Sequence, residues 1–172
     1  PHGDPSEGRP TLTLHSLTLL EAVKEHHEDC HFAPAHLLNP WFSALGTVGG
    51  GYALEELFDD KIPLLLGVET GLTSTPPMYR RIPSLDTLAL FSCSDAHSLD
   101  NIGRECTILE IEPGYRALFS TLQNGSRGNV LQFYKFPLVR TRYFLNGCFT
   151  CKEPFDATVC PQCRKPLVEG SR

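Results

Sequence analysis

Three short apolar runs of this sequence each end in a residue that can bind a metal ion. His36 follows the first run, Glu69 ends the second, and Asp95 and His97 follow the third. Carboxylates and imidazoles hold Zn, Mn or Fe, and two or more such ions can activate water to hydrolyse a phosphodiester. Because the carboxyl ends of barrel strands lie on one face, the pattern predicts a metal-dependent hydrolytic centre there.

Each of these residues also has a purely structural explanation. His36 could be a satisfied histidine at a strand end, Glu69 could bond a neighbouring loop, and Asp95 could cap the segment that follows it. Their joint occurrence at three strand ends favours the metal site.

Four of the seven cysteines form two CxxC pairs that are separated by eight residues. They are Cys148, Cys151, Cys160 and Cys163. Four thiolates at this spacing bind zinc tetrahedrally, and the metal replaces a core that so short a segment cannot build. Because protein ligands fill all four positions, the zinc should be structural. Two redox-active pairs are the alternative, but the surrounding thioredoxin-like pattern is missing.

The net charge of −5 is unevenly distributed along the chain. Residues 1–125 carry 7 Lys+Arg and 17 Asp+Glu, a balance of −10, whereas residues 126–172 carry 8 and 3, a balance of +5. We therefore expect an acidic metal-binding domain at 1–125 and a basic zinc-ribbon domain at 126–172. The basic tail fits a polyanionic substrate such as nucleic acid, and a solvated basic surface explains it about equally well.

The order of the expected elements indicates an α/β fold. Helices are expected over 16–26, 52–58 and 115–124, and strands over 30–36, 63–69, 87–93 and 106–111, before an extended stretch at 130–136. This alternation favours a parallel sheet. Three or four strands cannot close a barrel, and the chain opens with Pro1 and has a single methionine. We therefore expect a C-terminal piece of a longer protein.

Several classes of protein do not fit the sequence. There is no apolar run of membrane-spanning length and no leader-like opening, so we expect no membrane partner. The sequence lacks a P-loop and a GxSxG elbow. Use of CxxC pairs for metal suits a reducing compartment, so the predicted location is cytoplasmic.

Five blocks of the sequence, together with the cysteine-rich end, resemble endonuclease Q-like proteins of the PHP (polymerase and histidinol phosphatase) superfamily. The blocks are residues 34–36, 40–43, 69–72, 94–98 and 102–105. The resemblance implies the C-terminal part of a distorted (β/α)7 PHP barrel with a three-metal site, followed by a small zinc-ribbon-like domain.

The resemblance also implies a substrate and roles for individual residues. Family members nick DNA 5′ of deaminated bases and at abasic sites. His36, Asp95 and His97 would be catalytic metal ligands for Zn, Mn or Mg, and Glu69 would be a ligand or a partner behind the ligands. Aromatic and arginine side chains would surround an extruded base, namely Trp41, Phe42, Arg81 and Arg104.

Three departures from the family pattern bear on activity. The opening His-x-His of the family, and the Asp, His and Glu ligands after it, have no counterpart here. Cys148 stands where relatives often have His, which is a sound exchange for zinc. The stretch 138–145 keeps only Tyr143, Arg140 and Arg142 of the family's run. We therefore expect a fragment of a DNA repair endonuclease that is inactive by itself.

Two alternative functions remain open at this stage. One is a PHP phosphoesterase that acts on small phosphorylated substrates, although the zinc ribbon and basic tail argue against it. The other is a catalytically dead nucleic-acid-binding or adaptor protein. The sequence leaves open whether the chain is an enzyme and names no protein partner.

Overall fold

The computed structural model describes residues 11–47, 50–125, 129–141 and 144–170. The α-helices are α1 (Ser16–His26), α2 (Leu54–Phe58), α3 (Pro76–Tyr79) and α4 (Tyr115–Gln123). The strands are β1 (Val68–Glu69), β2 (Leu90–Phe91), β3 (Cys106–Leu109), β4 (Val130–Tyr134), β5 (Asn146–Gly147) and β6 (Pro154–Phe155). Within these ranges, no helix is both long and apolar enough to cross a membrane.

A short parallel sheet carries the candidate site. β1 and β2 pair with Val68 opposite Leu90. On the other edge of β1, the N–H of Leu66 donates to Phe32 O (2.9 Å) and that of Glu69 donates to Pro34 O (3.1 Å). The strand expected at 30–36 is thus an extended segment that runs beside β1, and Pro34 has no N–H for a regular ladder.

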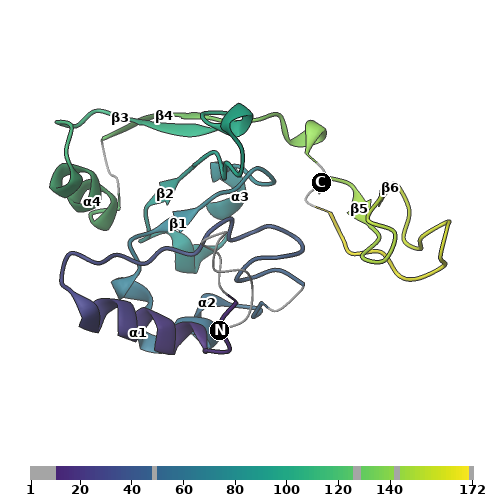
Figure 1. Cartoon of the computed structure of the whole chain (residues 1–172), viewed down its shortest axis with the longest axis horizontal. Coiled ribbons are helices and arrows are strands. Elements are labelled where there is room, and N and C mark those ends of the chain that lie inside the picture. The colour runs from purple at the N-terminus through teal and green to yellow at the C-terminus, as the bar shows by residue number, and fades with distance from the viewer. Residues whose placement is uncertain (1–10, 48–49, 126–128, 142–143, 171–172) are drawn as a thin grey trace.

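Both faces of this parallel layer are covered by apolar side chains. Val68 and Leu90 face the main core, which includes Leu20 of α1 and Phe58 of α2. On the other side a smaller cluster contains Leu66, Ala89 and Leu122 of α4. Coverage on both faces is typical of parallel sheets. Figure 1 shows the resulting layers, with α1 and α2 on one side of β1 and β2 and α4 on the other.

The expected strand at 63–69 is shorter in the structure. Residues Asp59–Leu64 form a 3-10 helix that contains Pro63, and the strand is limited to β1. Proline supplies no N–H for a strand ladder, so the regular pairing begins only after it. The helices expected at 16–26 and 115–124 agree with α1 and α4 within a residue.

The expected fourth strand pairs differently from a parallel barrel strand. β3 and β4 pair antiparallel, with Cys106 opposite Tyr134, and α4 lies between them in the chain. The β3–β4 pair joins residues on the two sides of position 125, where the sequence predicted a domain boundary. Among the described residues the strands form three two-stranded sheets.

Residues 144–170 form a compact unit, which we call the four-cysteine unit. β5 and β6 pair antiparallel, and single bridges join Gly147 to Val168 and Val159 to Pro166. Figure 1 shows this unit at one end of the molecule, on the side away from α1 and α4.

Candidate metal centre and nucleic-acid interface

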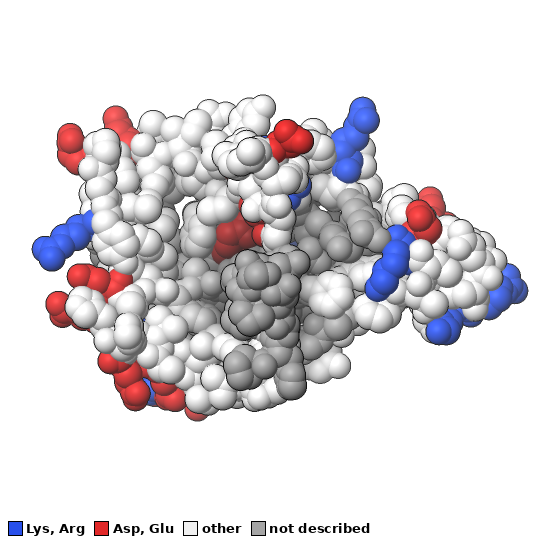
Figure 2. All heavy atoms as spheres, in the orientation of Figure 1, with Lys and Arg blue, Asp and Glu red and all other residues white. Residues whose placement is uncertain are grey.

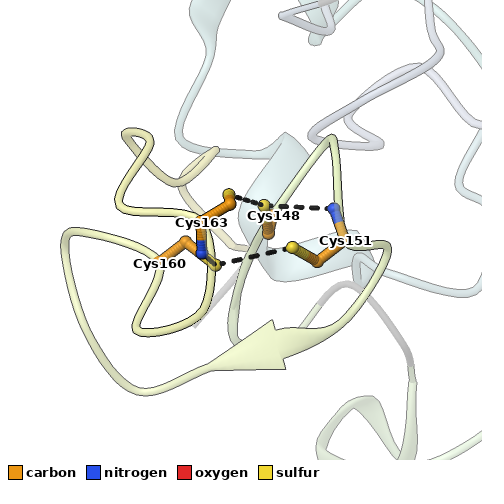
Figure 3. Close-up of side chains that lie close together, drawn as sticks. All are labelled: Cys148, Cys151, Cys160 and Cys163. Atoms are coloured by element: carbon orange, nitrogen blue, oxygen red, sulfur yellow. Dashed lines mark hydrogen bonds between the residues drawn. The ribbon is translucent and has the colours of Figure 1, made fainter.

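The four cysteines of the two CxxC pairs come together around one point (Figure 3). Their sulfur atoms all lie within 4.8 Å of one another. The Sγ atoms of Cys148 and Cys163 are 3.4 Å apart, and those of Cys151 and Cys160 are 3.9 Å apart. A tetrahedral zinc with Zn–S bonds of ~2.3 Å requires sulfur separations of about 3.8 Å. The geometry therefore fits one zinc ion.

Each CxxC pair forms a turn that directs main-chain N–H groups at sulfur. Cys151 N–H donates to Cys148 Sγ (3.3 Å), and Cys163 N–H donates to Cys160 Sγ (3.5 Å). Hydrogen bonds, the largest contribution being that from Cys151 N–H, lower the pKa of the Cys148 thiol to about 6, whereas the bond to Cys163 Sγ and burial raise the pKa of Cys151. Metals bind the thiolate, so these turns prepare the site for a cation. These sulfur contacts join one pair to the other, which favours a metal over two separate redox pairs.

The second candidate site is a cavity of about 350 Å³ beside the carboxyl ends of β1 and β2. His36 and Asp95 both line it. The other lining residues are Asn39, Leu72, Thr73, Arg104, Phe136, Arg140 and Thr141. The structure thus brings an imidazole, a carboxylate and two guanidinium groups to one hollow.

Glu69 lies behind this cavity and holds its main chain in place. Its Oε2 accepts from His36 N–H (2.7 Å), and its Oε1 accepts from the N–H groups of Gly71 (2.7 Å) and Cys93 (3.2 Å). The carboxylate is buried. Three bonds from three separate segments leave little of its capacity for a metal, so the geometry fits the partner role better than the ligand role.

The two candidate ligands in the cavity both have unusual backbone conformations. His36 has φ of 36° and Asp95 has φ of 47°, in the left-handed region. Gly71 packs so closely that a Cβ on it would lie 2.6 Å from His36 Cβ. Left-handed non-glycine residues cost about 1–3 kcal/mol and are held by their surroundings, often at functional sites. Here the bonds to Glu69 provide part of that support.

His97 lies beside Asp95 and outside the residues that line the cavity. Its Nδ1 is 2.9 Å from Asp95 O and 3.9 Å from Asp95 Oδ1. Among the described residues, only the four cysteines bring three or more ligand atoms within 4.8 Å of one another. The four ligands predicted from the strand ends are neighbours, but they do not form one coordination sphere.

The cavity contains side chains of the chemical types that bind divalent metals. His36 Nδ1 and Thr73 Oγ1 are buried without a hydrogen-bond partner among the described residues. An imidazole and a carboxylate are suitable donors for Zn, Mn or Mg. They are two protein ligands, whereas catalytic zinc sites commonly use three.

Arg104 lies on the wall of this cavity. Its Nε donates to Ser94 O (2.7 Å) and its Nη2 to Asp95 O (3.2 Å), which fixes the chain next to the candidate ligand. Arg140 also lines the cavity, while Arg142 and Tyr143 lie outside the described residues. Arg81 is exposed just after α3 and does not line the cavity.

Trp41 and Phe42 occupy different environments. Trp41 is only 4% exposed and packs on Gly147 of the four-cysteine unit. Its ring is therefore a packing surface in this structure, and not one that an extruded base can stack on. Phe42 is 50% exposed beside it.

Sequence reasoning missed an ion pair that joins the β3–β4 pair to the strands beside the cavity. Glu105 and Lys135 are bonded to each other, and their side chains are 0% and 12% exposed. Lys135 Nζ also bonds Thr70 Oγ1 and Ser92 Oγ, each at 3.1 Å, after the ends of β1 and β2. The sequence does contain a signal for this ion pair, because Glu105 directly precedes β3 and Lys135 directly follows β4.

The charges are distributed differently from the sequence count. Of the eight Lys and Arg in 126–172, Arg127, Arg142 and Arg172 lie outside the described residues, and the Lys135 side chain is only 12% exposed. Within 144–170, three basic side chains are balanced by three acidic ones. Figure 2 shows acidic groups gathered over the α1 and α4 side and several basic groups on the four-cysteine unit. Among the described residues of 126–172, the exposed basic side chains are those of Arg140, Lys152, Arg164 and Lys165.

No family model matches the chain. The uncharacterized protein YqxK of Bacillus subtilis (strain 168) is 30% identical over 137 residues, which are 78% of this chain and 35% of that protein. The chain thus spans about a third of the length of the curated relative that it matches.

Two solved structures share the fold. One is the lesion-specific endonuclease PfuEndoQ from Pyrococcus furiosus, with a TM-score of 0.74 and 23% identity over 95% of this chain and 42% of that one. The other is endonuclease Q in complex with a 27-mer duplex substrate that has an abasic lesion at the active site. It has a TM-score of 0.77 and 23% identity over 96% and 42% of the two chains. At this identity the comparison shows an endonuclease Q-like fold.

Proposed function

We propose that the chain is part of a metal-dependent DNA repair endonuclease of the PHP superfamily, and that its role is to bind the damaged strand. The supporting observation is the cavity that His36, Asp95, Arg104 and Arg140 line, in a fold shared with an endonuclease that is solved with abasic DNA. The substrates proposed are abasic sites and deaminated bases in duplex DNA.

The residues of the cavity have separate roles in this proposal. His36 and Asp95 would hold one metal in the cavity, and His97, which lies beside Asp95 but outside the cavity lining, would hold a different one. When bound, Zn, Mn or Mg would activate water and stabilise charge on the phosphate. Arg104 and Arg140 hold the phosphate, because planar guanidinium groups bind its oxygens in pairs. Glu69 positions the main chain of His36.

The number of ligands predicts binding without cleavage by this chain alone. The cavity contains one imidazole and one carboxylate, fewer protein ligands than a catalytic site commonly uses. The activity of a three-metal PHP barrel needs ligands beyond those described. A binding role is consistent with both the leading prediction and the adaptor alternative.

We further propose that residues 1–125 belong to the barrel and residues 126–172 to a zinc-ribbon domain. β4 lies in the second range and pairs with β3 of the first. The zinc stabilises the four-cysteine unit and takes no part in chemistry, because four cysteines fill its coordination sphere.

Equilibrium binding tests the proposal. Fluorescence anisotropy would compare an abasic duplex with the same duplex undamaged, at fixed salt because phosphate contacts make affinity depend on salt. We expect tighter binding to the abasic duplex, and a loss of that preference in the Arg104→Ala/Arg140→Ala variant. Arg81→Ala is the matched control and should keep it. Equal affinity of the wild type for both duplexes would refute the proposal.

A further inference from the structure

The four-cysteine unit packs directly against residues 39–43, the loop that borders the cavity. A Cβ at Gly147 would lie 2.5 Å from Trp41 Cζ2, so β5 approaches the indole as closely as a glycine allows. The Trp41 and Phe149 ring centroids are 5.7 Å apart. The single tryptophan of the chain therefore lies at the junction of the two parts.

Two aromatic rings remain on the surface at this junction, one from each part. Phe42 is 50% exposed and Phe149 is 45% exposed. Their centroids are 6.3 Å apart, and the planes are inclined by 47°. Lys152 Nζ lies 3.9 Å from the centroid of Phe149. We call Phe42, Phe149 and Lys152 the aromatic platform.

The platform is close to the cavity through a short and well-fixed loop. Asn39 lines the cavity, its Oδ1 accepts from Trp41 N–H (3.0 Å), and its carbonyl accepts from the hydroxyl of Ser43 (2.9 Å). The three residues from Asn39 to Phe42 span at most about 10 Å. Stacked nucleotides in one strand are separated by ~3.4 Å, so the platform lies within about three nucleotides of the cavity.

We infer that the aromatic platform stacks the unpaired nucleobase opposite the lesion, which loses its partner when the damaged nucleotide enters the cavity. This inference rests on the proposed function. Exposed aromatic rings bind bases of any sequence through their faces. Lys152 adds a positive charge beside the rings, which favours a polyanion.

A nucleic acid suits this surface better than an apolar protein segment does. The platform pairs two rings with a cation and adjoins a cavity that Arg104 and Arg140 line. Duplex DNA from which a nucleotide is extruded leaves a base without its partner. The platform provides a place for that base, and it combines residues from both parts of the chain.

The test uses the zinc-loaded full chain and an abasic duplex with 2-aminopurine opposite the lesion. Phe149→Leu keeps an apolar side chain but removes the aromatic face. We expect it to weaken binding by about 5- to 150-fold, the range for loss of one stacked base. It should also remove the change in 2-aminopurine fluorescence that binding produces. Phe149→Tyr keeps an aromatic face, so it should match the wild type in affinity and in the change of 2-aminopurine fluorescence.

Val159→Ala is the matched control, because Val159 lies in the same unit and is also 45% exposed. Trp41 fluorescence and zinc content verify that each variant keeps the junction intact. If Phe149→Leu binds like the wild type, or if Phe149→Tyr fails to restore binding, the inference is wrong while the proposed function stands. If the wild type shows no preference for the abasic duplex, the proposed function itself fails.

Discussion

The four-cysteine unit and the cavity beside β1 and β2 are two candidate metal sites built in opposite ways. The ligands of the first all lie within residues 148–163, on two tight turns. The second joins His36, Asp95 and Arg140, which are far apart in the sequence. The first has four ligands, and the second brings two candidate ligands to one cavity. A short segment can supply all the ligands of one metal by itself. Ligands at the ends of different strands come together only when the whole sheet forms.

This difference is also visible in what surrounds the two sites. Sulfur and main-chain N–H groups hold the four-cysteine unit together, and it has few buried apolar side chains. The cavity instead rests on the buried Glu69 and on the Glu105–Lys135 pair. We therefore expect metal removal to affect the first region most, and loss of a buried charge to affect the second.

The largest expected effect is the loss of zinc from the four-cysteine unit. Cys160→Ser removes one of four ligands, and structural zinc sites gain about 10–16 kcal/mol from the metal. We expect zinc content to fall from one ion per chain to none, and Trp41 fluorescence to shift as Gly147 leaves the indole. His36→Ala should retain the zinc. A full zinc complement in Cys160→Ser would show that the cysteines do not hold it.

The next effect concerns the buried pair behind the cavity. Lys135→Met leaves Glu105 charged and buried, which costs about 3–5 kcal/mol. Urea unfolding should therefore show a much lower midpoint. The matched control is Lys61→Met, because Lys61 pairs with Asp60 at the surface, where ion pairs contribute little. Equal midpoints for the two variants would contradict the role of the Glu105–Lys135 pair.

A smaller effect is expected at the junction between the two regions. Gly147→Ala places a methyl group 2.5 Å from Trp41, and overpacking of this kind costs about 1–3 kcal/mol. We expect altered Trp41 fluorescence with zinc still bound. Gly114→Ala is the control, since no atom lies within 4 Å of its Cβ position. Unchanged fluorescence in Gly147→Ala would mean that the two regions do not pack as described.

The smallest effect is a pH dependence on the α4 side. Burial lowers the pKa of His31, which stacks on Phe119 with centroids 4.4 Å apart. The unfolded chain therefore binds a proton more readily, and this part of the stability is lost as pH falls below 6.5 through the folded pKa. Hydrogen exchange in α4 should speed up on acidification. His31→Phe should remove that acceleration, and the same acceleration in this variant would rule out His31.

Sequence reasoning predicted the features that depend on neighbouring residues. The four cysteines and the bounds of α1 and α4 follow from local spacing and were correct. The parallel pairing of β1 and β2 also agrees, because their apolar residues are buried on both faces.

Features that depend on distant contacts were not predictable in the same way. The antiparallel pairing of β3 with β4, and the ion pair between Lys135 and Glu105, need partners 21–30 residues apart. Trp41 looked like a stacking residue until the structure placed Gly147 against it. Aromatic residues occur both in cores and in binding sites, so the sequence does not distinguish the two roles without the tertiary contacts.

The most direct test is a nicking assay with zinc-loaded chain in excess over an abasic duplex, in the presence of Mn²⁺, with binding followed in the same samples. The account predicts that the duplex is bound and remains uncut, because the cavity supplies two candidate ligands. Cleavage by the wild type that disappears in Asp95→Asn would contradict the account, since it would show that the ligands of this chain suffice for catalysis.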